Sequence, residues 1–304
     1  MPYRKFSDYL IEKYHEKVYK ISLNIKCSCP NRDGTKDNKG CIFCGETGAG
    51  FETLGNSVPI KEQLSKNIDY IGKKYNAEKF IAYFQSYSST YLPLDTFQYN
   101  INQAIDDRIL AVYISTRPDC LTDEQCLFLK NIKEKHHIDI VIELGLQSTH
   151  NQTLLYLNRH HTYEDFTDCV AMIKKHGLEV CVHMINDLPE ESLEHVIENA
   201  KRLSKLKVDQ VKCHSLYVLK NTVLGNRYEK GEIRLLTLDD FIERTISFLE
   251  YLDKTIVIQR LIGRAPKEET LFCNYGRNWR YIVDKIEADM LKNNRLQGSK
   301  SQVF

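Results

Sequence analysis

The chain alternates short β-branched runs with amphipathic segments of helical spacing, and this alternation restricts the fold more than its composition does. Six runs have the composition of strands, namely residues 18–25, 80–85, 111–115, 138–146, 179–185 and 210–216. Parallel neighbours need a helix to return the chain, so the alternation predicts a parallel sheet with right-handed crossovers. Because six units fall short of the eight that close a full barrel, we expect an α/β fold, a partial (β/α)6 TIM-like open barrel.

Apolar residues between these runs recur at spacings of three and four residues, as in helices that bury one face. The segments 64–75, 166–173 and 193–203 show this pattern. Residues 122–125, Thr-Asp-Glu-Gln, read as a capping box that starts the third helix. Gly177 follows a basic turn and marks the end of the fourth helix.

The same pattern divides the chain into three parts. Residues 1–17 form an N-terminal segment, residues 18–252 the barrel core, and residues 253–304 a C-terminal extension with an additional strand, at 256–261, and a helix. In barrels of this kind the site lies at the C-terminal ends of the strands. We therefore expect functional residues just after each predicted strand.

The overall charge gives no sign of a polyanionic partner. Lys and Arg number 42 against 41 Asp and Glu in 304 residues, a formal net charge of +1. A site for nucleic acid must therefore be a local patch. Residues 1–20 are charged and amphipathic, and no window has the roughly 18 apolar residues of a spanning helix. We expect a soluble cytoplasmic protein.

Four of the ten cysteines lie within eighteen residues, in the loop that follows the first predicted strand. Because the chain is large and shows no signal peptide, we expect reduced thiols rather than disulfides. Six isolated cysteines fit ordinary buried positions. The four clustered cysteines are Cys27, Cys29, Cys41 and Cys44.

The clustered thiols indicate a metal site. Cys41 and Cys44 form a Cys-x-x-Cys pair that can hold one metal centre, and Pro30 and the surrounding glycines allow turns that fold a third sulfur back. Three thiolates from one flexible loop suit an iron–sulfur cluster. Structural zinc needs a fourth ligand, which Cys27 can supply, and a redox Cys-x-x-Cys does not require Cys29. Both alternatives stay open.

The order Cys29, eleven residues, Cys41, two residues and Cys44, with Phe43 before the last cysteine, resembles the radical S-adenosylmethionine (SAM) superfamily. Residues 29–35 (CPNRDGT) and 40–44 (GCIFC) look like its YhcC/YtqA-type branch. The resemblance runs from about residue 4 to about residue 298. It includes the segments 84–91, 115–121, 143–148, 188–190 and 259–266.

This resemblance implies the metal ligands and the cofactor. It places a [4Fe–4S] cluster on Cys29, Cys41 and Cys44 and makes Cys27 a spectator thiol at the end of the first strand. Three cysteines leave one iron of a cubane without a protein ligand. That open position is where SAM binds in the family.

The resemblance also implies side chains that contact SAM. Gln85, Ser86 and Tyr87, after the second predicted strand, occupy the position where radical SAM enzymes recognise the amino group. Gln147 and Arg159 stand twelve residues apart, which is similar to the SAM-contacting pair of oxygen-independent coproporphyrinogen oxidase. A surface position for Arg159 is the alternative.

His183 and Glu143 extend this set. His183 lies where that relative has an aspartate, and a core histidine is the alternative. Glu143 stands in an apolar strand and must be paired, either with SAM or substrate or in a structural salt bridge. Residues 187–191, Asp-Leu-Pro-Glu-Glu, depart from the Gly-Leu-Pro-Gly-Glu usual in the branch. The loss of both glycines argues against a close backbone approach to the adenosyl group there.

His214 and Tyr217 are our candidates for the substrate side. Lys212, His214 and Leu216 share one face of the sixth strand, because alternate residues point the same way. His214 can instead satisfy a hydrogen bond in the core.

The C-terminal extension carries a local excess of positive charge. From residue 253 onward, ten Lys and Arg stand against six acids. Tyr275, Trp279 and Tyr281 are interleaved with Arg277 and Arg280, a mixture that suits an RNA backbone and stacked bases. Solvated charge on a helix explains the same residues.

The resemblance implies an enzyme that cleaves SAM reductively and uses the 5′-deoxyadenosyl radical to abstract a hydrogen atom. Members of the branch are implicated in tRNA wobble-uridine modification, from the carboxymethylaminomethyl group towards aminomethyl and methylaminomethyl uridine, and the branch is related to the Elongator catalytic subunit. We expect tRNA and a reductant such as flavodoxin or ferredoxin as partners, and no membrane. The alternatives are radical SAM chemistry on a porphyrinogen-like small molecule and a non-catalytic metal-bearing RNA-binding module.

Overall fold

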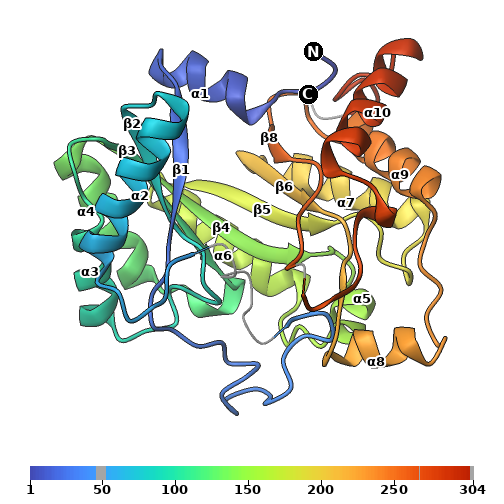
Figure 1. Cartoon of the computed structure of the whole chain (residues 1–304), viewed down its shortest axis with the longest axis horizontal. Coiled ribbons are helices and arrows are strands. Elements are labelled where there is room, and N and C mark those ends of the chain that lie inside the picture. Colours follow the sequence, from blue (N-terminus) through green and yellow to red (C-terminus); the bar gives the residue numbers. More distant parts are fainter. Residues whose placement is uncertain (46–52, 267, 302–304) are drawn as a thin grey trace.

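The computed structural model describes residues 1–45, 53–266 and 268–301, and its centre is one curved sheet of seven parallel strands (Figure 1). The strands are hydrogen-bonded in the order β1-β2-β3-β4-β5-β6-β8. Their bounds are β1 Val18–Leu23, β2 Lys79–Phe84, β3 Ile109–Thr116, β4 Asp139–Gln147, β5 Glu179–Ile185, β6 Gln210–His214 and β8 Val257–Arg260. The α/β open barrel that the alternation predicts is confirmed.

Helices return the chain between the strands and cover the outer face of the sheet (Figure 1). The main apolar core lies between these two layers. Along β2, Phe80, Ala82 and Phe84 belong to this core, whereas Ile81 and Tyr83 face the inside of the barrel. The helices of this layer are α2 Ile60–Tyr75, α3 Leu94–Gln103, α4 Asp123–His136, α6 Tyr163–Lys175, α7 Leu193–Lys205 and α9 Leu238–Tyr251, and α5 Asn151–Tyr156 lies in the loop after β4.

An N-terminal helix, α1 (Phe6–Tyr14), packs against the inside of the barrel where the strands begin (Figure 1). Leu10 joins the inner apolar cluster, and the Tyr14 hydroxyl donates to Asp139 Oδ2 at 2.6 Å, at the start of β4. Lys13 Nζ lies 2.7 Å from Glu179 Oε1, at the start of β5. The N-terminal end of the barrel is therefore covered, and the opposite end is the one left for a site.

The local signals for helix ends are confirmed. Gln125 N–H donates to Thr122 Oγ1 at 3.2 Å and the Gln125 side chain accepts from the Thr122 N–H, which is the capping box at the start of α4. Gly177 follows α6 with a φ of +68°, in the left-handed region that glycine enters without strain. Capping boxes also begin α6, α7 and α9.

The strand expected at 256–261 is β8, and it pairs in parallel with β6. It is therefore the seventh strand of the main sheet, because α9 returns the chain to the sheet edge as the earlier helices do. Gln210 and Val211 pair with Val257 and Ile258. The sheet is thus one strand wider than the six units predicted.

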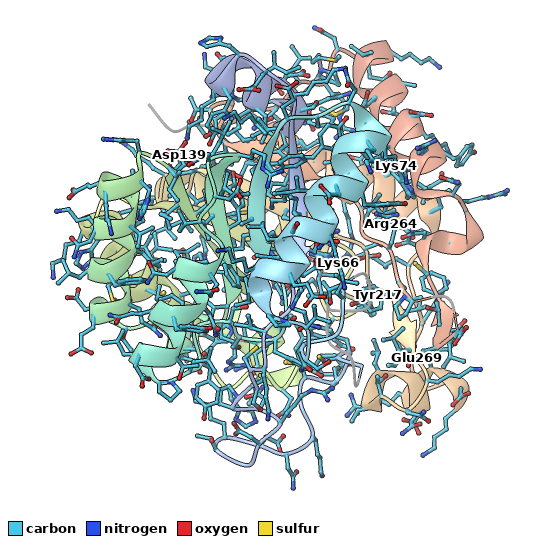
Figure 2. The ribbon with its side chains drawn as sticks, turned by 60° about the vertical axis from the view of Figure 1, so that its left-hand side comes forward. Lys66, Lys74, Asp139, Tyr217, Arg264 and Glu269 are labelled. Atoms are coloured by element: carbon cyan, nitrogen blue, oxygen red, sulfur yellow. The ribbon has the colours of Figure 1, made fainter. Side chains whose placement is uncertain are left out.

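The segments after β6 and β8 contribute a two-stranded sheet, in which β7 Val218–Leu219 pairs antiparallel with β9 Thr270–Phe272, and two helices, α8 Val223–Glu229 and α10 Trp279–Lys292. β7, α8 and β9 share a separate apolar cluster, whereas α10 packs into the main core. Tyr217 directly precedes β7 and lies well away from Asp139, at the start of the central strand β4 (Figure 2). Within the described ranges, every helix is too short or too polar to span a lipid bilayer.

Candidate active site

A cavity that is partly open to solvent lies at the C-terminal ends of the strands. Its lining comes from the loop after β1 and from the ends of β2, β3, β4, β5, β6 and β8. The cavity is therefore where an open barrel places its chemistry.

Three of the four clustered cysteines line this cavity, namely Cys29, Cys41 and Cys44. Cys27 is not in the lining. Its Sγ lies 3.3 Å from the Ser86 carbonyl oxygen, and the side chain packs against the main apolar core. Burial raises the pKa of Cys27 to about 12, so this group is a thiol at neutral pH. The structure thus separates Cys27 from the other three.

The cysteine loop is held by bonds to neighbouring segments. Ile42 N–H donates to the Leu157 carbonyl oxygen at 3.2 Å, and the Ile42 carbonyl oxygen accepts from Leu224 N–H at 2.8 Å. Arg32 Nη2 donates to the Cys44 and Gly45 carbonyl oxygens, both at 2.7 Å. Protein contacts alone therefore fix the backbone that carries Cys41 and Cys44.

Cys41 has two donors beside its sulfur. Arg159 Nη1 lies 3.2 Å and Asn31 Nδ2 3.6 Å from Cys41 Sγ. Hydrogen bonds to ligand sulfurs tune a metal centre. Burial raises the pKa of Cys44 to about 11, so a metal must displace its proton.

The spacing of the sulfurs bears on which metal they suit. Within the described part of the chain, the three cysteines of the lining form no group whose ligand atoms all lie within 4.8 Å of one another. Zinc bonds of about 2.3 Å would bring tetrahedral sulfurs to about 3.8 Å of each other. An all-sulfur donor set with wider spacing fits an iron–sulfur cluster better than one zinc ion.

The structure brings Gln147 and Arg159 together at the end of β4, and both line the cavity. Arg159 is buried, and its guanidinium also donates to the Gly145 carbonyl oxygen. A side chain at Gly145 would place Cβ 3.3 Å from Arg159 Nη2 and 3.4 Å from Gln147 Nε2. Glycine at this strand position therefore makes room for both, and Arg159 is not a surface residue.

Arg117 is a lining residue that the sequence reasoning missed. Its Nη2 donates to the Arg159 carbonyl oxygen at 2.7 Å, and its Nε and Nη2 bind the two Asp119 carboxylate oxygens at 2.9 Å each. Burial opposes ionisation of Asp119, but the hydrogen bond and charge of Arg117 lower its pKa to about 2. The available signal was position, because Arg117 directly follows β3.

Of the three residues after β2 that we expect to contact SAM, two line the cavity and one does not. Gln85 and Tyr87 line the cavity, whereas Ser86 is not in the lining and donates its hydroxyl to Asn24 Oδ1. Tyr87 has a φ of +41°, and the guanidinium carbon of Arg32 lies 5.8 Å from its ring centroid. Gln85 and Tyr87 therefore face the cavity, whereas Ser86 does not and forms a structural hydrogen bond instead.

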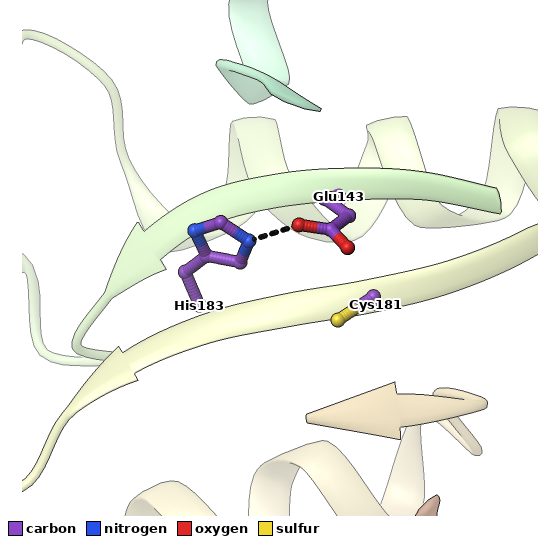
Figure 3. Close-up of side chains that lie close together, drawn as sticks. All are labelled: Glu143, Cys181 and His183. Atoms are coloured by element: carbon purple, nitrogen blue, oxygen red, sulfur yellow. Dashed lines mark hydrogen bonds and ion pairs between the residues drawn. The ribbon is translucent and has the colours of Figure 1, made fainter. Parts of the chain in front are cut away.

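Glu143 is fully buried inside the barrel and is not among the lining residues (Figure 3). Its carboxylate accepts from Lys20 Nζ, from Lys212 Nζ at 2.9 Å and from His183 Nε2 at 2.8 Å. Burial opposes its ionisation, but Lys20 and Lys212 hold the pKa of Glu143 well below its usual range. The structure thus brings Glu143 to a buried ion-pair network beneath the cavity.

Ligand atoms of Glu143, Cys181 and His183 lie within 4.8 Å of one another, which is a spacing that a metal ion could use (Figure 3). Two ammonium groups, of Lys20 and Lys212, already bind the same carboxylate. They would repel a cation at this position. The three side chains are therefore better understood as part of the ion-pair network.

His183, His214, Tyr217 and Lys212 line the cavity together with Arg260. Burial lowers the pKa of His183 to about 4, and burial with the charge of Arg260 holds that of His214 well below its usual range. Both imidazoles are therefore neutral at pH 7. Arg260 Nη2 lies 2.8 Å from His214 Nδ1. The sequence reasoning missed Arg260 because it assigned β8 to the C-terminal extension.

The loop that lacks the two glycines is fixed by its own acids. Asp187 Oδ1 accepts from Leu216 N–H at 2.7 Å, and Asp187 Oδ2 accepts from the Tyr275 hydroxyl at 2.6 Å. Glu191 accepts from the Ser148 hydroxyl and from Asn199 Nδ2, the latter at 3.1 Å. The side-chain bonds of Asp187 and Glu191 therefore hold this loop in place.

Two family models match the chain. The model described as Radical SAM superfamily matches residues 38–203, and the one described as Radical_SAM C-terminal domain matches residues 208–292. The uncharacterised protein YtqA of Bacillus subtilis (strain 168) is 32% identical over 298 residues, which cover 97% of this chain and 92% of that protein.

Two further similarities are more distant. The tRNA uridine(34) acetyltransferase of Methanocaldococcus jannaschii is 27% identical over 146 residues, which cover 47% of this chain and 26% of that protein. A solved structure of the archaeal Elp3 of Methanocaldococcus infernus matches with a TM-score of 0.68 and 17% identity, covering 92% of this chain and 64% of that one. The second similarity is one of fold.

Proposed function

The chain belongs to the radical SAM superfamily, and from this membership we propose that Cys29, Cys41 and Cys44 hold a [4Fe–4S] cluster and that SAM binds in the adjoining cavity. The observation that carries the proposal is the shared lining: three cysteines of one loop face polar side chains from six strand ends in one cavity. When both are bound, the cluster and SAM supply one-electron cleavage chemistry.

The protein's own side chains would position and shield this chemistry. Arg159 donates to Cys41 Sγ and lies beside Gln147, so it can orient the cluster ligand and a polar group of SAM together. Gln85 and Tyr87 face the same cavity from β2. His183 lines the same cavity and remains a candidate for contact with SAM, and the neutral imidazole of His214 and the hydroxyl of Tyr217 are our candidates for contact with the substrate.

The first test is anaerobic reconstitution with iron and sulfide. We expect absorbance near ~400 nm, about four irons per chain and release of 5′-deoxyadenosine from SAM. Tightly held zinc with neither signal would instead favour a non-catalytic metal-bearing module.

Exchange of single cysteines identifies the ligands. Cys41→Ala should abolish both iron binding and 5′-deoxyadenosine release, because it removes a sulfur that lines the cavity. Cys27→Ala is the matched control from the same loop and should leave both intact, since its thiol bonds to the Ser86 carbonyl oxygen. The reverse pattern would mean that Cys27 is a ligand.

We further propose that the substrate is tRNA and that the reaction modifies its wobble uridine, on the carboxymethylaminomethyl group. Two similarities support this proposal: the partial sequence match to a tRNA uridine(34) acetyltransferase and the fold likeness to Elp3. A mass-spectrometric analysis of tRNA nucleosides from a strain lacking the gene tests it. An unchanged wobble-uridine profile would refute it and leave small-molecule chemistry as the alternative.

A basic and aromatic surface at the start of α10 supports an RNA partner. Trp279 is 38% and Tyr281 49% exposed, and Arg280 and Arg277 lie over these rings at 5.3 Å and 5.9 Å. Tyr275 is not part of this surface, contrary to the sequence pattern. Its ring packs 5.6 Å from that of Phe241 and its hydroxyl binds Asp187.

Charge reversal tests this surface. Arg277→Glu with Arg280→Glu should weaken tRNA binding by about tenfold or more at low salt and flatten its salt dependence, because two phosphate contacts are lost. Lys66→Glu with Lys74→Glu, on exposed α2, is the matched control and should change binding little (Figure 2). Equal weakening by both pairs would show that no defined RNA surface exists at α10.

A further inference from the structure

The buried network inside the barrel has more positive than negative charge. Lys20 and Lys212 share the single carboxylate of Glu143, and His183 is neutral with a pKa of about 4. This group of four side chains therefore carries a net charge of +1. Among the residues that the structure describes, no aspartate or glutamate lines the cavity above it. Buried charges are normally paired, so this excess needs an explanation.

Lys20 is satisfied by its surroundings. Besides Glu143 it donates to Gln259 Oε1 at 2.7 Å, and its ammonium lies 4.4 Å and 4.2 Å from the ring centroids of Tyr83 and Tyr113. Aromatic faces stabilise a buried cation. Lys20 also does not line the cavity. The excess charge is therefore not directed to a ligand through Lys20.

Lys212 differs from Lys20 because it lines the cavity. Its Nζ bonds to Glu143 Oε2 and to the Tyr83 hydroxyl, both at 2.9 Å, and lies 4.5 Å from the Tyr83 ring centroid. An ammonium has three N–H donors, so one of them has no hydrogen-bond partner among the described residues. Tyr217 lines the same cavity, and its hydroxyl has no hydrogen bond to any residue of the described ranges. One charged donor and one neutral donor thus come from β6 and the turn after it.

We propose that Lys212 binds a carboxylate of the substrate, with the Tyr217 hydroxyl as a second donor. One charged donor and one neutral donor suit the two oxygens of a carboxylate better than the three oxygens and double charge of a phosphate monoester. This proposal rests on the proposed function, because it requires that the cavity holds the substrate. It adds that the substrate carries a carboxylate. The carboxymethylaminomethyl group of the proposed uridine carries such a carboxylate.

SAM also has a carboxylate, and the surroundings of Lys212 argue for the substrate as the source. The hydrogen-bond partners of Lys212 come from β2 and β4, inside the barrel. Of the side chains proposed for SAM, Arg159 contacts Cys41 Sγ, and both Arg159 and Gln147 lie around Gly145. The hydrogen bonds of Lys212 instead tie it to the barrel interior and not to the described part of the cysteine loop.

The experiment uses the reconstituted protein and two probes that differ only in charge, N-acetylglycine and N-acetylglycinamide. Calorimetric or NMR titration should show that the wild type prefers the carboxylate by about tenfold, since one charge-assisted hydrogen bond is at stake. In Lys212→Met this preference should disappear, and in Lys212→Arg it should persist. Lys66→Met, which removes a lysine from the exposed surface of α2, is the control and should keep the preference.

Three further readouts separate the outcomes. A preference that survives in Lys212→Met overturns the proposal, and so does a parallel fall in SAM affinity, which would make SAM the source of the carboxylate. Anticodon stem-loops with carboxymethylaminomethyluridine or methylaminomethyluridine form a second arm. If the small probes discriminate through Lys212 but neither RNA binds, the carboxylate subsite stands and the tRNA function falls. Unchanged thermal melting of each variant shows that loss of binding is not loss of fold.

Discussion

Glu143 illustrates how a single residue determines the interior of this barrel. A carboxylate with no exposed surface is stabilised by two ammonium groups and an imidazole from three other strands. The sequence showed only that an acid in an apolar strand must be paired. Its partners, Lys20 and Lys212, are 123 and 69 residues away in sequence, so no local pattern could identify them. The sheet order brings them together.

Removal of this carboxylate should be costly. Glu143→Gln leaves two buried ammonium groups without their counter-charge, and we expect about 3 kcal/mol less stability in denaturant unfolding at pH 7. The pKa of Glu143 is lowered in the fold, so its stabilising effect is present above its unfolded pKa of about 4.3 and is lost as pH falls below that value. The gap between wild type and variant should therefore narrow in acid.

A surface pair provides the control for this prediction. Glu62→Gln breaks the ion pair with Lys66 on α2, where both side chains are about half exposed (Figure 2). We expect a change of only about 0.5 kcal/mol or less. Equal losses in the two variants would contradict the buried network as a source of stability.

At the scale of elements, the predictable parts were those with local causes. Strand positions, the Thr122 capping box and the stop at Gly177 follow from neighbouring residues, and the structure confirms them. Contacts between loops were not predictable in this way. Arg117 reaches the Arg159 carbonyl oxygen from the adjacent strand end, and Asp187 reaches Tyr275 across the mouth of the barrel. Both depend on register and sheet order rather than on sequence spacing.

The Asp187 link between the loop after β5 and the segment before α10 should be sensitive to pH. Burial raises the pKa of Asp187 to about 6, above an unfolded value of about 3.9. Its contribution to stability is thus fully present below about pH 4 and is lost as pH rises through 6. Asp187→Asn stays neutral, so it should exceed wild type by about 2 kcal/mol at pH 7 and match it near pH 4.

The pKa of Asp123 shifts in the opposite direction to that of Asp187. Asp123 lies exposed at the start of α4, and a hydrogen bond from His176 lowers its pKa. Asp123→Asn should therefore be less stable than wild type at pH 7, and the difference should shrink in acid. Unfolding curves between about pH 2 and pH 8 measure both variants, since the change for Asp123 occurs below about pH 4. If the difference in stability between Asp187→Asn and wild type does not change with pH, the fold does not raise the pKa of Asp187.

For the molecule as a whole, the main departure from the sequence-based picture concerns the last fifty residues. β8 completes the sheet beside β6, and Ile282, Ile286 and Met290 of α10 are fully buried in the main core. At the N-terminal end, the Pro2 carbonyl oxygen accepts a hydrogen bond from Gln297 N–H, and Arg4 N–H donates one to Gln297 Oε1, both at 2.9 Å. Hydrophobic periodicity identified the strand and helix, but it could not show that they pack into the core.

This packing predicts that a chain ending at Leu252 will not fold. Loss of residues 253–304 would leave the β6 edge unpaired and uncover the core beneath α10. Unpaired strand edges with apolar neighbours favour aggregation. We expect insoluble protein or no cooperative melting by circular dichroism. Within the full chain, Ile258→Asp, at a buried position of β8, should destabilise strongly, whereas Leu291→Asp, 62% exposed on α10, should change stability by about 0.5 kcal/mol or less. A soluble 1–252 fragment that melts cooperatively would show instead that the barrel core is complete without its seventh strand.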